Sequence, residues 1–287
     1  MTDETTAKKI ETRTQQHEVE IDAPLEAVWK AITDADEIIR WFCEEARVTP
    51  GVGGTVWHSW GEGQSGESAI EAWEPNKRLR VRLTPYGKMD AEAITGQPMV
   101  TEYVLESRGN KTVIRLVHSG IPDAPGWEGY YDGTNRGWQL FLLALRHYIE
   151  KHAGTPRDNI MIMKPIAGSL ESAWRRLIGK EGLGLGESVA GPDSLASANS
   201  VQDLPRYSSV TALGDKLEGE VMMAKPPKTL LLNIESLSDA LLTITFEEMA
   251  GTTYFYLTLA TFGLGQESFD ALRSRWTNWL EKLLVAG

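Results

Sequence analysis

Residues 24–32 read Pro24-Leu-Glu-Ala-Val-Trp-Lys-Ala-Ile32, and a related sequence, Ser169-Leu-Glu-Ser-Ala-Trp-Arg-Arg-Leu-Ile178, begins 145 positions later. In the first copy the apolar residues recur at i, i+3, i+4 and i+7, which is typical of a helix with one buried face. Pro24 suits the first position of such a helix, because its missing N–H would have no partner there. A second match pairs Leu116–Ile121 with Leu259–Leu264, 143 positions later. Two matches in the same order favour an internal duplication.

The residues around the first copy predict one complete α+β unit. An alternating strand, His17–Ile21, precedes the helix, and a second short helix follows at Asp36–Phe42. From Glu45 to Gly120 the apolar residues alternate with period two between turns rich in Gly, Pro and Asn, which predicts an antiparallel meander of five or six strands. A long amphipathic helix is expected from about Asn135 to His152. One sheet around one helix must fill its concave face with side chains or leave a cavity there.

The second half repeats this order more weakly. We expect a polar leader over residues 1–16 and two domains, 17–154 and 155–287, each a curved antiparallel sheet around a long C-terminal helix. Residues 182–200 are rich in Gly, Ser and Ala and predict a flexible loop. The other elements expected in this half are strands at 160–163, 207–213, 229–234, 240–247 and 252–261 and a terminal helix at 268–286.

The composition excludes several classes of protein. Of the 287 residues, 29 are basic and 40 acidic, and there is no run of Lys or Arg, so neither nucleic acid nor an anionic membrane is an expected partner. The N-terminus lacks the layout of a signal peptide, and no apolar stretch is long enough to cross a membrane, so a cytoplasmic location is expected. The single cysteine, Cys43, excludes an internal disulfide and is expected to be structural.

No cofactor or metal site is expected. The segment Gly182–Glu187 lacks the Lys-Ser/Thr of a phosphate-binding loop. His147 and His152 are five residues apart on the long helix, which puts them too far around it to share a face, and no matching carboxylate set accompanies them.

Aromatic residues and histidines are unevenly distributed. Seven of the ten tryptophans and all five histidines precede residue 154. His58 shares a strand face with Val56 and Trp60, while Trp57 lies on the opposite face, and ligand contact at either face is open. His118 either serves as an acid or base or hydrogen-bonds the following loop. Together the candidate ligand-binding residues are Trp41, Phe42, Trp57, His58, Trp60, Trp73, Tyr103, His118, Trp138 and Phe141.

Several of these stretches resemble one known family, the bacterial homologues of the activator of the 90-kDa heat-shock chaperone ATPase (AHSA-type), within the START-like (SRPBCC) superfamily. The resemblance covers about residues 17–154. It is carried by Ala23 to Trp29 with Thr33-Asp34 and Trp41-Phe42, by Val52-Gly53-Gly54, by Trp73 to Leu79, by Lys111-Thr112 and His118-Ser119-Gly120, and by Gly137-Trp138. The second half looks like a diverged copy that lacks counterparts of Trp41-Phe42 and Gly53-Gly54.

The resemblance implies a helix-grip fold and a small apolar or aromatic molecule bound between sheet and helix in the first domain. Fold alone does not decide between functions, so two other classes stay open. One is a co-chaperone-like or stress-response module that contacts a chaperone or client protein through an exposed apolar patch. The other is an enzyme of cyclase or hydrolase type, which requires His118 or His58 within hydrogen-bond reach of a pocket carboxylate or hydroxyl.

Overall fold

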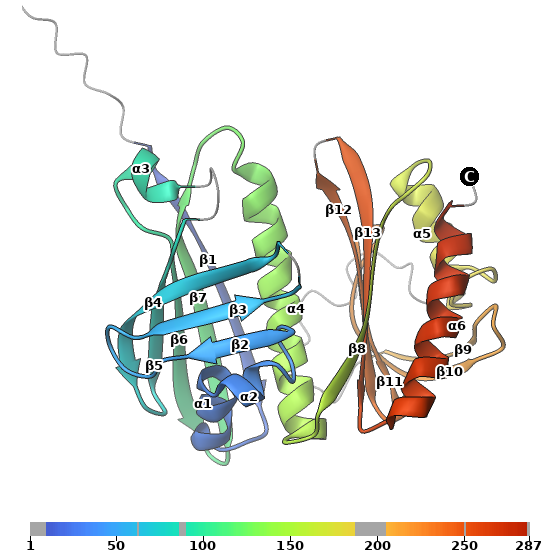
Figure 1. Ribbon diagram of the computed structural model, residues 1–287, viewed down its shortest axis with the longest axis horizontal. Helices are drawn as coiled ribbons and strands as arrows, with labels where there is room; N and C mark the ends of the chain where they lie inside the picture. The colour runs from blue at the N-terminus through green and yellow to red at the C-terminus, as the bar shows by residue number, and fades with distance from the viewer. Residues whose placement is uncertain (1–9, 62, 86–89, 187–204, 250, 286–287) are drawn as a thin grey trace, which may run out of the picture. The chain divides into compact units, whose positions relative to one another are not determined.

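A computed structural model of the chain describes residues 10–61, 63–85, 90–186, 205–249 and 251–285. The contacts between residues divide the chain into two compact units, Met1–Gly154 and Thr155–Gly287. Each unit combines one antiparallel sheet with one long helix that follows the last strand (Figure 1). The predicted α+β class with two helix-grip units is confirmed.

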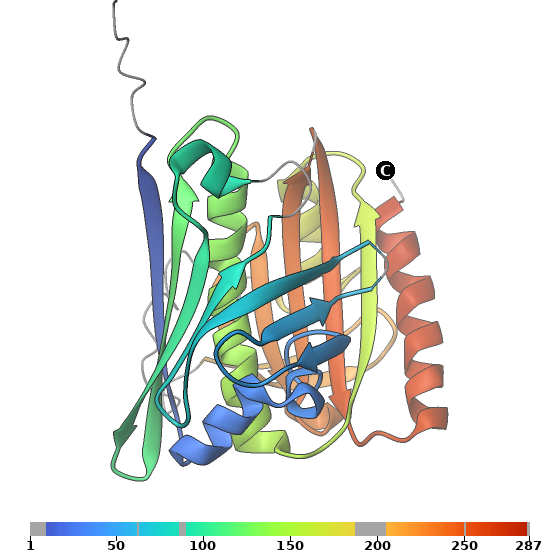
Figure 2. The same cartoon turned by 60° about the vertical axis from the view of Figure 1, so that its left-hand side comes forward.

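Unit 1 is a seven-stranded sheet in the order β1-β7-β6-β5-β4-β3-β2. Figure 2 shows its strands curving around the helix α4. Two short helices follow the first strand, as predicted. The elements are β1 (Thr12–Ile21), α1 (Leu25–Thr33), α2 (Ala35–Ile38), β2 (Glu45–Val48), β3 (Thr55–Ser59), β4 (Ser65–Glu74), β5 (Arg78–Leu83), α3 (Ala91–Thr95), β6 (Val100–Arg108), β7 (Lys111–Pro122) and α4 (Glu128–His152).

Unit 2 has a six-stranded sheet in the order β8-β13-β12-β11-β10-β9. In each unit the first strand pairs with the last strand: β1 with β7 in unit 1 and β8 with β13 in unit 2. The elements are β8 (Arg157–Pro165), α5 (Leu170–Ile178), β9 (Arg206–Val210), β10 (Lys216–Lys225), β11 (Thr229–Ile234), the 3-10 turn η3 (Glu235–Leu237), β12 (Ala240–Met249), β13 (Thr252–Phe262) and α6 (Gln266–Val285).

The repeated sequence marks equivalent positions in the two units. Pro24 is the N-cap of α1 and Ser169 the N-cap of α5, and each helix is nine residues long. The Ser169 hydroxyl accepts a hydrogen bond from the backbone N–H of Ser172, which satisfies one donor of the first turn. Pro24 makes no such side-chain bond, while the backbone carbonyls of Pro24 and Ser169 both accept a hydrogen bond from the first turn of their helix.

Several elements differ from the sequence predictions. β1 begins at Thr12 rather than His17, so the expected leader contributes to the sheet. α4 begins at Glu128, seven residues before the predicted start. Gly129 and Gly133 make that first part a poor helix by propensity, and tertiary contacts override it. Gln15 of β1 donates a hydrogen bond to the carbonyl of Tyr131.

The glycine-rich segment of unit 2 is a further difference. Its residues 187–200 lie outside the described part of the chain, but residues 182–186 do not form a flexible linker. Leu183 and Leu185 are buried in the core of unit 2. A Cβ at Gly182 would lie 2.0 Å from the carbonyl oxygen of Leu177, so this glycine allows a close backbone approach.

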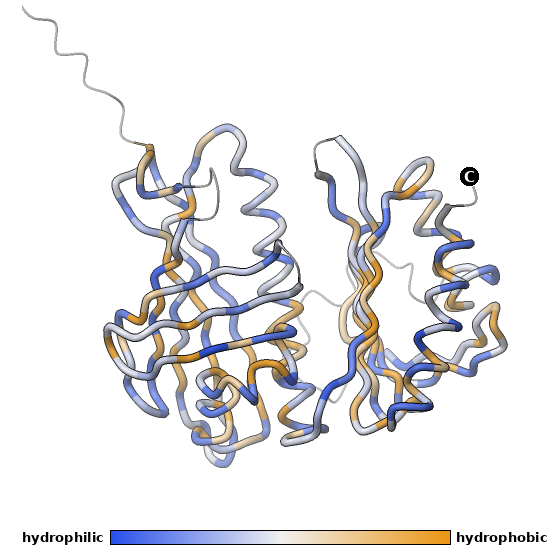
Figure 3. The backbone as a smooth tube through the Cα atoms, viewed as in Figure 1, coloured by the Kyte–Doolittle hydropathy of each residue, from blue (hydrophilic) through white to orange (hydrophobic). Residues whose placement is uncertain are grey.

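The interior of unit 2 is filled by large side chains. Phe246 lies between Trp174 and Phe255, with ring centroids 6.4 and 5.4 Å away, and all six residues of β11 are buried. Figure 3 shows hydrophobic residues along the strands of this sheet. The long helix α6 adds Trp276, of which 1% is exposed.

Candidate functional site

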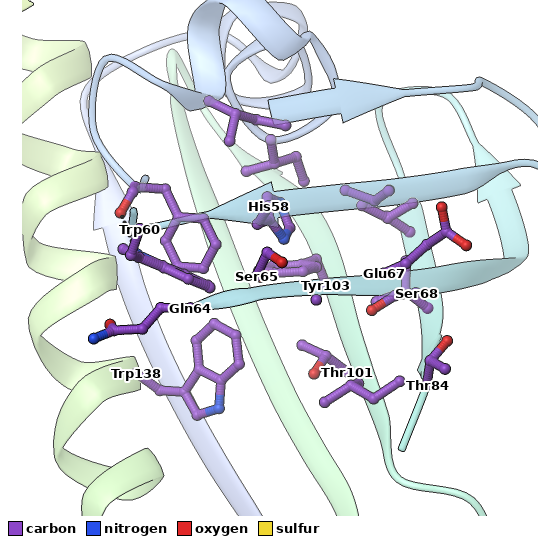
Figure 4. A pocket seen from close by; sticks show the side chains of 18 of the residues that line it. His58, Trp60, Gln64, Ser65, Glu67, Ser68, Thr84, Thr101, Tyr103 and Trp138 are labelled. Carbon is purple, nitrogen blue, oxygen red and sulfur yellow. Dashed lines mark hydrogen bonds between the residues drawn. The ribbon is translucent and has the colours of Figure 1, made fainter. Parts of the chain in front are cut away.

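Unit 1 contains a cavity of about 390 Å³ between the inner face of its sheet, the α2 region and α4 (Figure 4). Its deep walls are mainly aromatic and aliphatic, and polar residues from the start of β4 surround its mouth. The lining residues are Ile32, Ile38, Trp41, Phe42, Val56, His58, Trp60, Gln64, Ser65, Gly66, Glu67, Ser68, Leu79, Val81, Leu83, Thr84, Thr101, Tyr103 and Trp138.

The β-sheet side of the cavity follows from strand alternation. On β5, Leu79 and Val81 face the cavity, while the intervening Arg80 lies on the outer face and pairs with Glu71 at 2.9 Å. On β6, Thr101 and Tyr103 face inward, and Glu102 pairs with Arg78 outside. These pairs form a charged outer face, and the period of two therefore separates charged from cavity-lining side chains.

Phe42 is the centre of the aromatic wall. Its ring centroid lies 4.9 Å from that of His58, 5.1 Å from that of Trp60 and 4.6 Å from that of Phe141, and it stacks on Trp138 at 6.3 Å. The indole N–H of Trp60 donates to the Phe42 carbonyl at 3.0 Å. This bond fixes the chain after α2 against the end of β3, so the wall is held by backbone as well as by ring contacts.

His58 and Tyr103 can each form a hydrogen bond with a ligand without first breaking a hydrogen bond within the protein. Among the described residues, neither the His58 imidazole nor the Tyr103 hydroxyl has a hydrogen-bond partner. Burial lowers the pKa of His58 to about 4. Burial likewise raises the pKa of Tyr103 above its ordinary value. At neutral pH both groups are uncharged.

His118 lies behind the cavity wall. It is 1% exposed and does not line the cavity, but its Nδ1 atom lies 2.9 Å from the hydroxyl of Thr101, which does. Its Nε2 atom lies 3.3 Å from the hydroxyl of Tyr130. Burial lowers the pKa of His118 to about 4. A hydrogen bond with the backbone of Val100 has the opposite, smaller effect. The imidazole therefore connects β6, β7 and α4.

The structure brings six of the ten predicted residues together at the cavity: Trp41, Phe42, His58, Trp60, Tyr103 and Trp138.

The other four lie elsewhere. Phe141 packs behind Phe42, and His118 lies behind Thr101. Trp57 is on the opposite face of β3, where the guanidinium of Arg47 lies 4.0 Å from its ring centroid. Trp73 packs edge-on against Trp29 at 5.2 Å, in the core beside α1. Because neighbouring residues of a strand point to opposite faces of the sheet, Trp57 and His58 cannot both line the cavity.

Sequence reasoning missed the aliphatic and polar parts of the lining. Leu79, Val81 and Leu83 form a clear alternating pattern in the sequence, and the inward parity of β5 identifies them once the sheet is known to curve around α4. The mouth residues Gln64 to Ser68 carry no such signal. They lie where β4 begins, opposite the end of β3, with Ser65 paired to Ser59.

The remaining titratable candidates do not form a metal centre. Among the described residues, no group of three or more His, Cys, Asp or Glu side chains could hold a metal ion. The rings of His147 and His152 do meet, at 5.2 Å between centroids, contrary to the expected separation around the helix. Cys43 is fully buried, and its thiol lies 3.2 Å from the carbonyl of Glu45, an arrangement that fits a structural role.

Unit 2 shows a different kind of depression. Its volume is about 600 Å³, and its lining is polar apart from Tyr207, with Arg206 and Glu235 joined by an ion pair of 2.6 Å. The large aromatic side chains of this unit lie in the packed core instead. An apolar cavity is thus a feature of unit 1 among the described residues.

No curated protein matches this sequence. The chain is similar to the Aha1 dimer from Colwellia psychrerythraea, at 24% identity over 50% of this chain and 99% of that chain, with a TM-score of 0.43. It is similar to protein MLL2253 from Mesorhizobium loti, at 25% identity over 49% of this chain and 98% of that one, with a TM-score of 0.43. The di-domain ARO/CYC BexL from the BE-7585A biosynthetic pathway is 15% identical over 94% of this chain and 97% of its own, with a TM-score of 0.43.

Within the described residues, no helix combines the length and the apolar composition that crossing a membrane requires.

The family model described as Activator of Hsp90 ATPase homolog 1-like protein matches residues 22–150, a range that runs from the end of β1 to the last turns of α4. This match covers less than half of the chain, and it confirms the resemblance that residues 17–154 show in the sequence.

Proposed function

We propose that unit 1 binds a small apolar or aromatic molecule in the cavity between its sheet and α4. The observation that supports this most directly is the apolar cavity of about 390 Å³ between the sheet and α4. Cavities of this size lined by aromatic residues with a few polar groups are typical of small-molecule sites.

A probe that fluoresces in apolar surroundings tests the proposal. N-phenyl-1-naphthylamine is neutral, so its binding reports apolar contact without charge. We expect saturable binding to the full chain and at least a tenfold rise in Kd for Val81→Phe, which places a ring inside the cavity. Val104→Phe makes the same change on the outer face of β6 and is the matched control. Equal affinities of the two variants and the wild type would remove the cavity as the binding site.

The catalytic alternative has one geometric observation in its favour. The hydroxyl of Thr101 lines the cavity and is within hydrogen-bond reach of His118, which is the arrangement an acid–base role requires. However, Thr101 is only 2% exposed, and a histidine with a pKa of about 4 is a weak base at neutral pH. The geometry therefore supports binding more strongly than catalysis.

The protein-interaction alternative receives less support. It requires a contiguous exposed apolar patch. The large exposed apolar side chains of unit 1 among the described residues, Val52 and Ile94, belong to different segments, and in the described part of unit 2 only Met161 and Met163 share a strand, β8. A chaperone or client protein as partner remains a prediction from the family resemblance.

A further inference from the structure

The polar groups of the cavity are few and specific. His58 comes from β3 and Tyr103 from β6, and both line the cavity (Figure 4). The other described polar side chains of the lining fall into three groups. Those from Gln64 to Ser68 and Thr84 lie at the mouth. The hydroxyl of Thr101 is already bonded to His118, and the rest are indoles of the aromatic wall. The indole N–H of Trp138 also lacks a partner, but its nitrogen is buried within the wall. A bound molecule therefore meets His58 and Tyr103 as the uncommitted hydrogen-bonding groups of the described interior.

These two groups differ in position but share their chemistry. The Tyr103 ring lies edge-on to Trp138, with centroids 6.4 Å apart, and His58 lies edge-on to Phe42. A neutral imidazole has one donor and one acceptor nitrogen, and a phenol hydroxyl both donates and accepts. The complement to such a pair is a group that also donates and accepts, which a hydroxyl does and a ketone does not.

The charge around the cavity disfavours an anion. Among its described lining residues there is no lysine or arginine, and Glu67 lies at the mouth. An anionic ligand would lose its hydration without gaining a counter-ion, which disfavours its binding. A purely apolar ligand would leave His58 and Tyr103 without hydrogen-bond partners once it displaces water, which also weakens binding.

We propose that the cavity selects an uncharged aromatic molecule that carries a hydroxyl group, a phenol, whose hydroxyl bonds to Tyr103 and His58. This inference rests on the proposed binding function and specifies the ligand class. The aromatic ring lies against the wall of Phe42, Trp60 and Trp138, where edge and face contacts between rings are available.

Three probes with the same ring system separate the contributions. Naphthalene, 2-naphthol and 2-naphthoate are apolar, phenolic and anionic at pH 7, and equilibrium dialysis against the full chain measures each affinity. We expect 2-naphthol to bind at least tenfold more tightly than either of the others. Equal affinities for naphthalene and 2-naphthol, or tighter binding of 2-naphthoate, would overturn the phenol inference and leave the binding function in place. Binding of none of the three would count against the binding function itself.

Variants assign the preference to the two residues. Tyr103→Phe and His58→Leu should bring the affinity for 2-naphthol to within threefold of that for naphthalene. The affinity for naphthalene itself should stay the same or rise, because no polar group is then left without a partner. Retained binding of naphthalene also shows that the variants fold. Tyr131→Phe removes a hydroxyl in the same unit away from the cavity and should keep the full preference. A preference that survives in both cavity variants would exclude these residues as its source.

Discussion

His118 and Thr101 lie directly opposite each other on β7 and β6, and the Nδ1 atom of the imidazole is 2.9 Å from the threonine hydroxyl oxygen. The pair is almost fully buried, with 1% and 2% of the two residues exposed. Since Thr101 also lines the cavity, the pair connects the wall of the cavity to the hydrogen bond between His118 and Tyr130. A neutral histidine at this place makes the stability of unit 1 depend on pH.

The first prediction is a loss of stability in acid that depends on His118. Its pKa falls from the ordinary 6.5 to about 4 on folding, because burial disfavours the charged form. As the pH decreases from 6.5 towards 4, the unfolded chain binds a proton that the folded chain does not, so the free energy of unfolding falls. For a shift of this size the full loss is roughly 3 kcal/mol.

Urea titrations followed by tryptophan fluorescence at pH 7 and pH 4.5 measure this loss. In His118→Gln the free energy of unfolding should change between pH 7 and pH 4.5 by about 2 kcal/mol less than in the wild type. This expectation holds whatever the stability of the variant at pH 7. His152→Gln removes one histidine elsewhere on the chain and is the control. The same pH dependence in all three proteins would contradict a buried neutral His118.

The second prediction concerns the contact between α2 and the end of α4. Glu37 is 8% exposed, and its carboxylate accepts hydrogen bonds from Lys30 and Arg40, both at 2.8 Å, and from the hydroxyl of Tyr148. Although burial raises it, the hydrogen bonds from Lys30 and Tyr148 hold the pKa of Glu37 below its ordinary value. The Tyr148 hydroxyl also accepts from the backbone N–H of Gly154 at 2.9 Å.

Tyr148→Phe removes both bonds of this hydroxyl and should lower the free energy of unfolding by about 2 kcal/mol. Tyr131→Phe, the control, should change it by less than about 0.5 kcal/mol. Because the Tyr148 bond to Glu37 is shared, Glu37→Gln combined with Tyr148→Phe should cost less than the sum of the two single changes. Additive costs would show that the two residues stabilise the unit independently.

The third prediction assigns a structural reason to the family stretch Val52-Gly53-Gly54. A Cβ at Gly54 would lie 1.9 Å from the carbonyl oxygen of Thr49, while Gly54 itself accepts a hydrogen bond from Ile70. Gly54→Ala should therefore destabilise unit 1 by about 2–3 kcal/mol. Gly66→Ala, where no atom lies within 4 Å of the added carbon, should be neutral or slightly stabilising in the same urea titration. Equal effects of the two changes would remove close backbone approach as the reason.

The sequence predicts those features that depend on neighbouring residues, and it does not predict those that depend on how distant elements pack. Element order, the repeat and the face that His58 shares with Val56 and Trp60 follow from local patterns, because helix and strand periodicity are properties of neighbouring residues. Which face of β3 lines the cavity is not a local property, and the sequence leaves it open. The position of Trp73 beside Trp29, by contrast, depends on how β4 crosses α1, and no local pattern contains that information. The early start of α4 was missed for the same reason, since contacts with β1 stabilise it.

The last prediction concerns the glycine-rich segment whose sequence suggested a linker. Leu183 is completely buried, and its backbone N–H bonds to the carbonyl of Leu177 at 2.6 Å. Leu183→Ala should therefore lower the free energy of unfolding by about 3 kcal/mol, through lost burial and the cavity left behind. Val210→Ala on the neighbouring strand β9, where 59% of the residue is exposed, should change it by less than about 0.5 kcal/mol. If both changes were equally mild in urea titrations of the full chain, the segment would be the linker that its composition indicates. A selective cost at Leu183 shows instead that the glycines let the backbone pass close to α5 and β9, so that the intervening leucines reach the core.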